Sequence, residues 1–390
     1  MQGKISKYLK RIFLLLLIAI PVILLIGYSM DARVHYADNP LALNWNNDGP
    51  YVFFENDSIL SINYIKGNST DGFFLEQKNT PVDSFKYAKC YYPIDSTSFD
   101  FPIKTDFETP KSTYSDTNKI LAISDIEGNF KTFRNFLINN QVIDDNLNWT
   151  FGNGHLVLIG DFIDRGYFDT QVLWFIYKLE YEAKKLGGYV HYILGNHELK
   201  MMQGNYYATD PKYSDIAAIL EKKQIELYDS NSLIGNWLAS KNALELINGN
   251  LFVHGGIHPD LAHSKLSIEE INQIIRLHYY RPFEAAKNEK QIEFLISTST
   301  GPCWYRGYFK DGLSQEQIDS TLERFNAKSV IVGHTIQSKV NSRYNRKVIG
   351  IDVQHPNDDH KLWPEGKSEA LFIDGKIYYR IFNNGDKKEI

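Results

Sequence analysis

This sequence has little cysteine and no excess of positive charge. Only Cys90 and Cys303 are cysteines among 390 residues, and they lie far apart, so neither a disulfide framework nor a cysteine metal site is indicated. Lysine and arginine number 42 against 47 acidic residues, a net charge of −5, which argues against a nucleic-acid-binding protein. With 43% hydrophobic and 23% charged residues, the composition is that of a globular protein and excludes a disordered chain.

One segment lacks charge altogether. The run from Ile12 to Met30 follows a basic stretch that ends in Lys10 and Arg11, and Asp31 closes it. Its length is close to the ~20 residues that span a bilayer, and no polar face interrupts it, which argues against a buried core helix. We therefore predict a single-pass membrane anchor in residues 1–30, with residues 12–30 in contact with the membrane. The basic flank predicts a cytoplasmic N-terminus and an extracytoplasmic catalytic domain, periplasmic or at the cell surface.

Cleavage of this segment is the alternative. The sequence Gly27-Tyr28-Ser29 has the small-x-small pattern of a signal-peptidase site, and cleavage there would give a secreted protein. No cysteine follows that would serve as a lipoprotein anchor. We favour the uncleaved anchor.

The remaining chain divides near residue 117. Residues 31–117 are rich in Asn, Asp, Ser and Tyr and contain short alternating apolar runs, which predicts a small β-rich, loopy N-terminal region. In residues 118–390, short apolar runs alternate with helical spacing, as at 130–138 and 172–186. This alternation is typical of an α/β layered domain.

Five apolar runs of this domain each end in polar side chains that can bind metal. The runs are 120–124, 155–159, 189–194, 251–253 and 329–332. The polar residues at or near their ends are Asp125, Asp161, Asn196, His254 and His334. Because ligand sites form where the carboxyl ends of strands converge, we expect these side chains to share one crevice.

The donor types of this crevice suit transition metals. Carboxylate, amide and imidazole ligands together favour Mn, Fe or Zn, and Asp161 is the natural bridge between two metals. Two metals lower the pKa of a shared water, and the resulting hydroxide can attack phosphorus in line. His197, oriented by Asp164, is placed to donate a proton to the leaving oxygen, and Arg165 to hold the phosphate oxygens.

The polar residues also form an ordered set of motifs. These are GDxxDRG at 160–166, GNHE at 195–198, HGG at 254–256 and GHT at 333–335. The set resembles the calcineurin-like metallophosphoesterases, phosphoprotein phosphatase branch, over about residues 119–355. The segments 233–238, 251–257 and 301–307 make the chain most similar to the Shewanella-like phosphatases.

This resemblance implies a fold, a cofactor and residue roles. The implied fold is an α/β metallophosphoesterase fold, a β-sheet sandwich flanked by helices. The implied cofactor is two divalent metal ions, manganese by first choice and iron or zinc otherwise. The implied roles are a first metal on Asp125 and Asp161, a second on Asp161, Asn196, His254 and His334, an acid dyad of His197 and Asp164, and phosphate binding by Arg165 and Arg306.

Glu127 departs from the family pattern. The first motif of the family reads Asp-x-His, whereas this chain reads Asp125-Ile126-Glu127. Glutamate is a competent oxygen ligand, so we predict that Glu127 binds the first metal in a harder site that favours Mn or Fe. The alternative is that Glu127 turns outward and one metal site is lost.

We therefore predict a membrane-anchored, metal-dependent phosphoesterase that hydrolyses phosphomonoesters by a metal-bridging hydroxide. Its expected partners are phosphorylated proteins or small phosphate esters and the membrane, with no nucleic acid. Two alternatives remain: a nucleotide or dinucleoside polyphosphate hydrolase, and a degenerate scaffold that binds a phosphorylated partner without turnover, motivated by Glu127.

Overall fold

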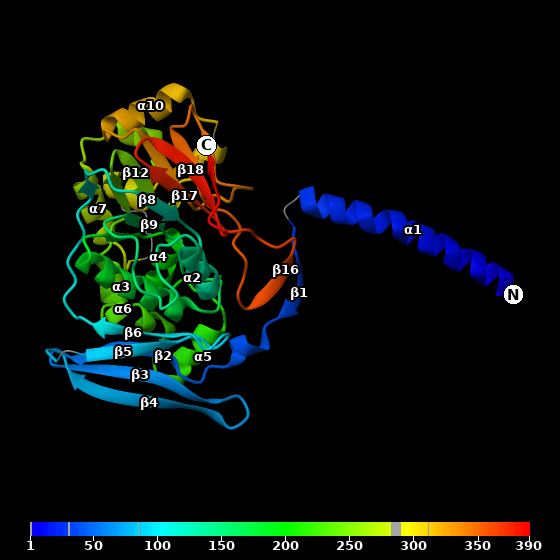
Figure 1. Ribbon diagram of the computed structural model, residues 1–390, viewed down its shortest axis with the longest axis horizontal. Helices are drawn as coiled ribbons and strands as arrows, with labels where there is room; N and C mark the ends of the chain where they lie inside the picture. The colour runs from blue at the N-terminus through cyan, green and yellow to red at the C-terminus, as the bar shows by residue number, and fades with distance from the viewer. Residues whose placement is uncertain (1, 30–31, 85, 282–289, 311) are drawn as a thin grey trace.

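The computed structural model describes the whole chain except residues 1, 30–31, 85, 282–289 and 311. Residues 1 and 30, the limits of the predicted anchor, therefore lie outside the described residues. The chain begins with one long helix, α1 (Gln2–Ser29), which extends away from the rest of the protein (Figure 1). Within it, Ser6–Gly27 is long and apolar enough to cross a membrane, with mean hydropathy 2.7 and no buried surface.

Two six-stranded sheets form the centre of the protein. The first has the order β10 (Tyr189–Ile193), β9 (His155–Ile159), β8 (Ile120–Ile123), β17 (Glu369–Asp374), β18 (Ile377–Phe382), β19 (Lys387–Glu389). The second has the order β14 (Asn341–Arg343), β15 (Val348–Gly350), β13 (Ser329–Val332), β12 (Asn250–Val253), β11 (Leu244–Ile247), β7 (Thr113–Tyr114). Apolar side chains of both sheets, such as Val157 and Ile331, are buried in one cluster between them. This is the predicted sheet sandwich.

Helices cover the sandwich (Figure 1). On the side of the first sheet lie α2 (Phe130–Asn139), α3 (Asp169–Lys185), α4 (Asn196–Gln203), α5 (Lys212–Ile219) and α6 (Leu233–Ala239). The short helix η2 (Gln224–Leu227) packs on α5. The others follow β12 in the chain: η3 (Pro259–His263), α7 (Ile268–Arg276), α8 (Lys290–Ile296), α9 (Gly307–Lys310) and α10 (Gln315–Arg324). Helix α3 packs on β10, and α7 packs on β11. The two helices predicted from apolar spacing correspond to α2 and α3.

The N-terminal region is built from strands, as its composition indicates. It contains η1 (Pro40–Leu43), a three-stranded sheet of β2 (Asp48–Asn56), β3 (Ile59–Asn68) and β4 (Gly72–Pro81), and a hairpin of β5 (Lys86–Tyr91) and β6 (Ser98–Ile103). Strand β1 (Val34–Asp38) pairs with β16 (His360–Trp363), far away in the sequence. The region is attached to α3, where the Trp174 indole donates to the carbonyl of Pro50 at 2.8 Å.

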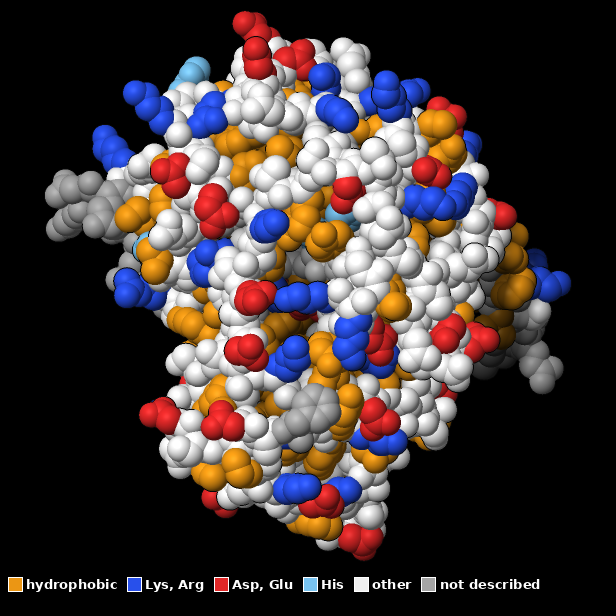
Figure 2. All heavy atoms as spheres, turned by 60° about the vertical axis from the view of Figure 1, so that its left-hand side comes forward, with side chains coloured by type: hydrophobic (Ala, Val, Ile, Leu, Met, Phe, Trp, Pro, Cys, Tyr) orange, Lys and Arg blue, Asp and Glu red, His pale blue; other side chains and the backbone are white. Residues whose placement is uncertain are grey.

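The parallel strands fix the position of the site. Strands β8, β9 and β10 are parallel neighbours in one sheet, and β12, β13 and β15 are parallel neighbours in the other. Their carboxyl ends therefore meet at one edge of the sandwich. On the face shown in Figure 2, basic and acidic side chains are intermixed, as expected for a nearly balanced charge.

Candidate active site

Left-handed backbone turns direct the polar residues into the crevice. Asp125, Asp161 and His334 have φ values of 55°, 55° and 63°, and each follows a strand of the sandwich by one or two residues. The loops are tied together, since the Asp125 amide donates to the Gly160 carbonyl and the Glu127 amide to the Asp161 carbonyl, both at 3.0 Å. A Cβ atom at Gly195 would lie 2.2 Å from Asp161 Oδ1, so only glycine permits this close approach.

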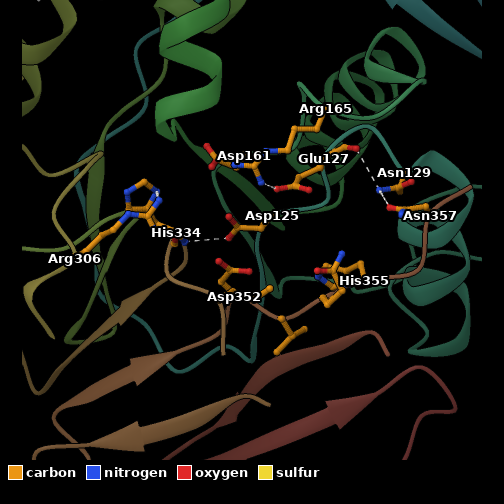
Figure 3. A pocket seen from close by; sticks show the side chains of 13 residues that line it. Asp125, Glu127, Asn129, Asp161, Arg165, Arg306, His334, Asp352, His355 and Asn357 are labelled. Atoms are coloured by element: carbon orange, nitrogen blue, oxygen red, sulfur yellow. Dashed lines mark hydrogen bonds and ion pairs between the residues drawn. The ribbon is translucent and has the colours of Figure 1, made fainter. Parts of the chain in front are cut away.

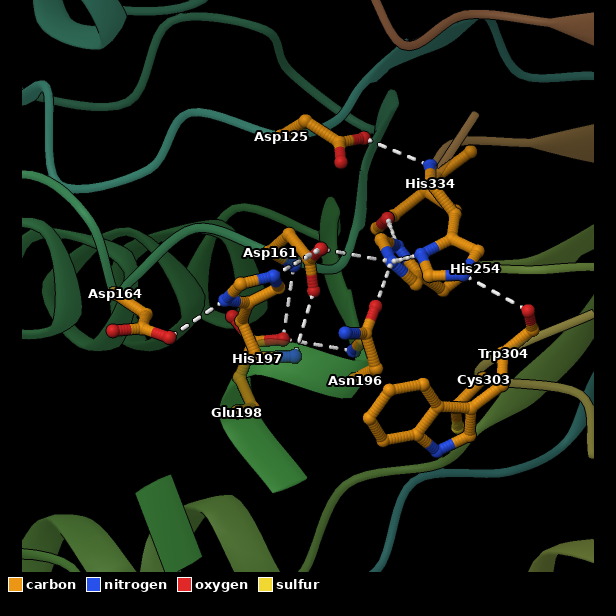
Figure 4. Close-up of polar contacts among 12 residues, drawn as sticks. Asp125, Asp161, Asp164, Asn196, His197, Glu198, His254, Cys303, Trp304 and His334 are labelled. Carbon is orange, nitrogen blue, oxygen red and sulfur yellow. Dashed lines mark hydrogen bonds and ion pairs between the residues drawn. The ribbon is translucent and has the colours of Figure 1, made fainter. Parts of the chain in front are cut away.

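Asp161, Asn196, His254 and His334 converge as predicted (Figure 4). His254 Nε2 lies 3.1 Å from Asp161 Oδ2, 3.1 Å from Asn196 Oδ1 and 3.2 Å from His334 Nδ1. Ligand atoms of Asp161, His254 and His334 all lie within 4.8 Å of one another, and all three residues are buried. This grouping is compact enough to hold a metal ion.

Backbone carbonyls orient the two imidazoles. His254 Nδ1 donates to the carbonyl of Ile159 at 2.7 Å, and His334 Nε2 donates to the carbonyl of Trp304 at 2.9 Å. The other nitrogen of each ring is then free to present a lone pair to the centre of the cluster, which is the arrangement that metal-binding histidines require.

The charges of the cluster perturb each other. Burial lowers the pKa of His254, but the adjacent Asp161 carboxylate outweighs it and raises the value to about 9. Burial raises the pKa of Asp161, but the charges of His254 and His197 outweigh it and hold the value below the ordinary range. Burial, together with the charge of His254, lowers the pKa of His334 to about 2.

Four carboxylates, one of them Asp161 of this cluster, face an adjoining cavity of about 210 Å³ (Figure 3). Asp125, Glu127, Asp161 and Asp352 all line it. Burial, with the charge of Asp352, raises the pKa of Asp125 well above its usual range. Burial also raises the pKa of Asp352 to about 7. Buried carboxylates and imidazoles gathered in this way fit divalent cations, which would offset the repulsion among the acids.

Glu127 lies in the same cavity, but its carboxylate has a partner. Its Oε1 forms an ion pair with a guanidinium nitrogen of Arg165, and its side chain is 21% exposed. The backbone carbonyl of Glu127 points the other way and accepts from Asn129 Nδ2 at 3.2 Å. The structure thus brings Glu127 beside Asp125 and Asp161, with its carboxylate paired to Arg165.

His197 and Asp164 form a buried pair next to the cluster. His197 Nδ1 lies 2.6 Å from Asp164 Oδ2, and its Nε2 lies 3.7 Å from Asp161 Oδ2. The backbone amide of His197 donates to Asp161 Oδ1 at 2.9 Å. Asp164 therefore fixes the ring so that Nε2 faces the crevice, which is the geometry that a general acid needs.

Two arginines flank the cavity from opposite sides (Figure 3). Arg165 contacts His197 Nε2 at 2.9 Å in addition to Glu127. Arg306 donates to the backbone carbonyl of His334 and lies 3.3 Å from His334 Nδ1. Both guanidinium groups line the cavity, where an anionic group would meet two sets of planar donors.

Sequence reasoning missed three residues of this site. Asp352 lies two residues after β15, so the same strand-end signal was present there. Glu198, in the GNHE motif, is buried and accepts from the backbone amides of Asp161, Phe162 and Gly195 at 2.8–2.9 Å, which fixes the loop that carries Asp161. Lys200, on α4, lies 3.3 Å from His197 Nε2, and only its spacing from Asn196 could have indicated it.

Known phosphatases are similar to this chain in sequence and in structure. The chain is 29% identical to Shewanella-like protein phosphatase 1 of Plasmodium berghei over 294 residues, which are 66% of this chain and 75% of that protein. It is 24% identical to Shewanella-like protein phosphatase 2 of Arabidopsis thaliana over 324 residues, which are 70% of this chain and 79% of that protein. The crystal structure of a cold-active protein-tyrosine phosphatase from a psychrophilic Shewanella species matches with a TM-score of 0.75 and 27% identity, covering 88% of this chain and 98% of that one.

These findings confirm the predicted family and the prediction of a hydrolase of phosphate esters. The family profile described as calcineurin-like phosphoesterase matches residues 118–338, more than half of the chain. The chain belongs to the calcineurin-like phosphoesterase family.

Proposed function

We propose that this protein is a metal-dependent phosphoprotein phosphatase that acts on phosphotyrosine. The observation that carries the proposal is the buried His197–Asp164 pair, with Nδ1 and Oδ2 2.6 Å apart, set between the Asp161–His254–His334 cluster and Arg165. A proton donor, a metal cluster and phosphate-binding cations are the groups that phosphomonoester hydrolysis needs in one place.

Two divalent ions fit the donors of the crevice. Asp125, Glu127 and Asp161 would hold one ion, and Asp161, Asn196, His254 and His334 the other. Manganese suits this mixture of oxygen and nitrogen ligands, with iron or zinc as alternatives. When bound, the ions supply Lewis-acid charge to a phosphoryl oxygen and lower the pKa of water.

The side chains of the protein carry the remaining tasks. Arg165 and Arg306 bind the phosphoryl oxygens from two sides of the cavity. His197 holds a proton at Nε2 and passes it to the leaving oxygen, while Asp164 keeps Nδ1 protonated and the ring in place. Glu198 holds the backbone amides of Asp161 and Phe162, and so keeps the Asp161 carboxylate where the histidines meet it.

The residues that line the entrance support an aromatic substrate. A second, open cavity of about 480 Å³ adjoins His197 and is lined by Trp304 and Tyr305 as well as by Arg165 and Arg306. Trp304 is half-buried at this entrance and offers ring surface to a phosphotyrosine side chain. The matching crystal structure is that of a protein described as a protein-tyrosine phosphatase, which supports the same substrate class.

Phosphate release by the full-length chain in detergent, stripped of metal and reloaded with Mn, Zn, Fe or Mg, tests the proposal. The substrates are p-nitrophenyl phosphate, a phosphotyrosine peptide, the matched phosphoserine peptide, ATP and a dinucleoside polyphosphate. We expect metal-dependent turnover, fastest on the phosphotyrosine peptide and reduced by about 10²-fold or more in His197→Ala. Faster release from the nucleotides would favour the anhydride hydrolase. Phosphopeptide binding without turnover under any metal would favour the non-catalytic scaffold.

We also propose that α1 tethers the enzyme to a membrane, with the N-terminus in the cytoplasm and the catalytic domain outside. The β1–β16 ribbon supports the tether. Val34 follows the apolar span by no more than about 25 Å of extended chain, so the ribbon must lie near the bilayer surface. Val34, Tyr36 and Trp363 on it are 51%, 61% and 54% exposed, and tryptophan and tyrosine are the residues preferred at membrane interfaces.

Alkaline carbonate extraction of membranes that contain the full-length chain tests the tether. We expect the protein to stay in the membrane pellet, and protease added from the cytoplasmic side to leave residues 32–390 intact. A soluble protein whose mass shows cleavage near residue 29 would overturn the tether and favour the secreted form.

A further inference from the structure

Lys200 lies in the entrance cavity, and neither the family motifs nor the metal cluster assigns it a role. It is half-buried on α4, four residues after Asn196 and three after His197, so all three side chains lie on neighbouring positions of one helix. Its Nζ lies 3.3 Å from His197 Nε2 and 5.4 Å from the centre of the Trp304 ring. It lines the same open cavity as Arg165 and Arg306.

Of the cations in this cavity, Arg165 has a carboxylate partner, whereas Lys200 has none among the described residues. Arg165 pairs with Glu127, and Arg306 donates to the backbone carbonyl of His334. Among the described residues, no carboxylate lies within ion-pair distance of Lys200 Nζ. A half-buried ammonium without an anionic partner, in the open cavity of the site, is available to an anion that arrives with the substrate.

The position of Lys200 indicates which part of the substrate it meets. In the proposed reaction His197 Nε2 delivers a proton to the leaving oxygen, and Lys200 Nζ lies 3.3 Å from that same atom. The neighbouring Trp304 ring is where the organic part of the substrate would lie. Lys200 is thus on the leaving-group side of the site, whereas Arg306, beside His334, is on the phosphoryl side.

We propose that Lys200 is a further catalytic residue, which binds the leaving-group oxygen and stabilises its negative charge as the bond to phosphorus breaks. This assignment rests on the phosphomonoesterase function proposed above. In the reaction, the oxygen of water forms the new bond to phosphorus, and the leaving oxygen departs with the electron pair of the broken bond. That oxygen then takes the proton of His197, and the proton lost from water restores the imidazole. Lys200 keeps its own protons and contributes charge.

The test compares Lys200→Met, Lys200→Arg and the wild-type full-length enzyme on a series of aryl phosphates. The series runs from p-nitrophenyl phosphate, a good leaving group, to phenyl phosphate and phosphotyrosine, which are poorer ones. Because the charge on the leaving oxygen matters most for poor leaving groups, kcat of Lys200→Met should fall by about 10-fold on the first and about 10²-fold on the last. Lys200→Arg should keep most of the activity on all of them. Lys184→Met, which changes an exposed lysine paired with Glu108, is the matched control and should behave as the wild type.

The outcomes separate this assignment from the proposed function. Wild-type turnover with an equal loss on every substrate in Lys200→Met, or a loss confined to KM, would overturn the leaving-group role alone. A wild type without turnover on any phosphomonoester would overturn the proposed function and this assignment with it. Equal Mn binding and equal thermal unfolding of wild type and variants exclude misfolding as the cause of a loss.

Discussion

Glu127 is the side chain on which the proposed first metal site depends. It stands where the family motif has histidine, and it shares the cavity with Asp125 while it pairs with Arg165. A carboxylate at this position adds negative charge beside Asp125, whose pKa is already raised by burial. Binding of a cation close to Glu127 would therefore be favoured. The ion pair with Arg165 does not prevent ligation, since a carboxylate has a second oxygen.

We expect two Mn ions per wild-type chain and one in Glu127→Ala, measured by elemental analysis after equilibration with Mn and gel filtration. The weakened site should lose affinity by at least about 10-fold, as found when a ligand or its support is removed. Glu127→His, which restores the family motif, should bind two ions again. Glu108→Ala, at an exposed glutamate, is the control. Two tightly held ions in Glu127→Ala would show that Glu127 serves only to hold Arg165.

Residues that follow strands were the predictable part of the site. Asp125, Asp161, Asn196, His254 and His334 each come after an apolar run, and parallel pairing brings the ends of such runs together. Asp352, two residues after β15, follows the same rule. Lys200 obeys no such rule, since a lysine on a helix is usually solvated and only the fold reveals that this one faces His197.

At the level of elements, the N-terminal sheet is joined to the catalytic domain by a buried ion pair. Lys212 Nζ of α5 lies 2.6 Å from Asp48 Oδ2 of β2, and both side chains are almost fully buried. Lys212 also donates to the Tyr167 carbonyl at 3.0 Å, and Asp48 Oδ1 accepts from Tyr51 at 2.6 Å. Removing one partner of such a pair leaves an uncompensated charge in a low-dielectric environment.

Lys212→Met should therefore lower the free energy of unfolding by about 3–5 kcal/mol, measured by urea titration in detergent. Asp48→Asn combined with Lys212→Met should recover part of the loss, because no buried charge is left alone. The exposed pair Lys184–Glu108 is the matched control, and Lys184→Met should leave the unfolding midpoint unchanged. An unchanged midpoint in Lys212→Met would mean that the N-terminal sheet unfolds independently of the catalytic domain.

The strand content of this region was readable from the sequence, but its attachments were not. Alternating apolar residues around turns indicate hairpins such as β2–β3, which need only local contacts. The pairing of β1 with β16, and of β7 with β11, joins residues that are far apart in the chain. Such pairs are selected by the packing of the whole molecule, and local patterns do not encode them.

At the scale of the whole molecule, the sandwich contains histidines whose pKa burial lowers, so that they stay neutral. His355 is the clearest example, since burial lowers its pKa to about 4. Its Nε2 donates to the Ser124 carbonyl at the end of β8, at 3.1 Å, and its Nδ1 lies 3.1 Å from the Ser368 hydroxyl just before β17. It therefore connects the segment after β15, in one sheet, to two strands of the other.

The sign of the resulting pH dependence follows from proton binding. The unfolded chain protonates His355 near its ordinary pKa of about 6.5, whereas the folded protein resists protonation until about pH 4. The unfolded state then binds more protons within this window, so the contribution of His355 to stability is complete above about pH 6.5 and is lost as the pH falls toward 4. The size of this contribution is about 3 kcal/mol.

His355→Gln, which keeps a donor and an acceptor but does not titrate, should reduce the acid sensitivity of the whole protein. In urea titrations of chelator-treated protein between pH 7 and pH 4.5, the wild type should lose more unfolding free energy than the variant, by up to about 3 kcal/mol. The chelator is needed because release of metal in acid would steepen the pH dependence of the unfolding free energy in both proteins. His258→Gln, at a histidine outside the buried core, should follow the wild-type slope. Equal slopes for wild type and His355→Gln would mean that the buried carboxylates of the site, and not this histidine, govern acid unfolding.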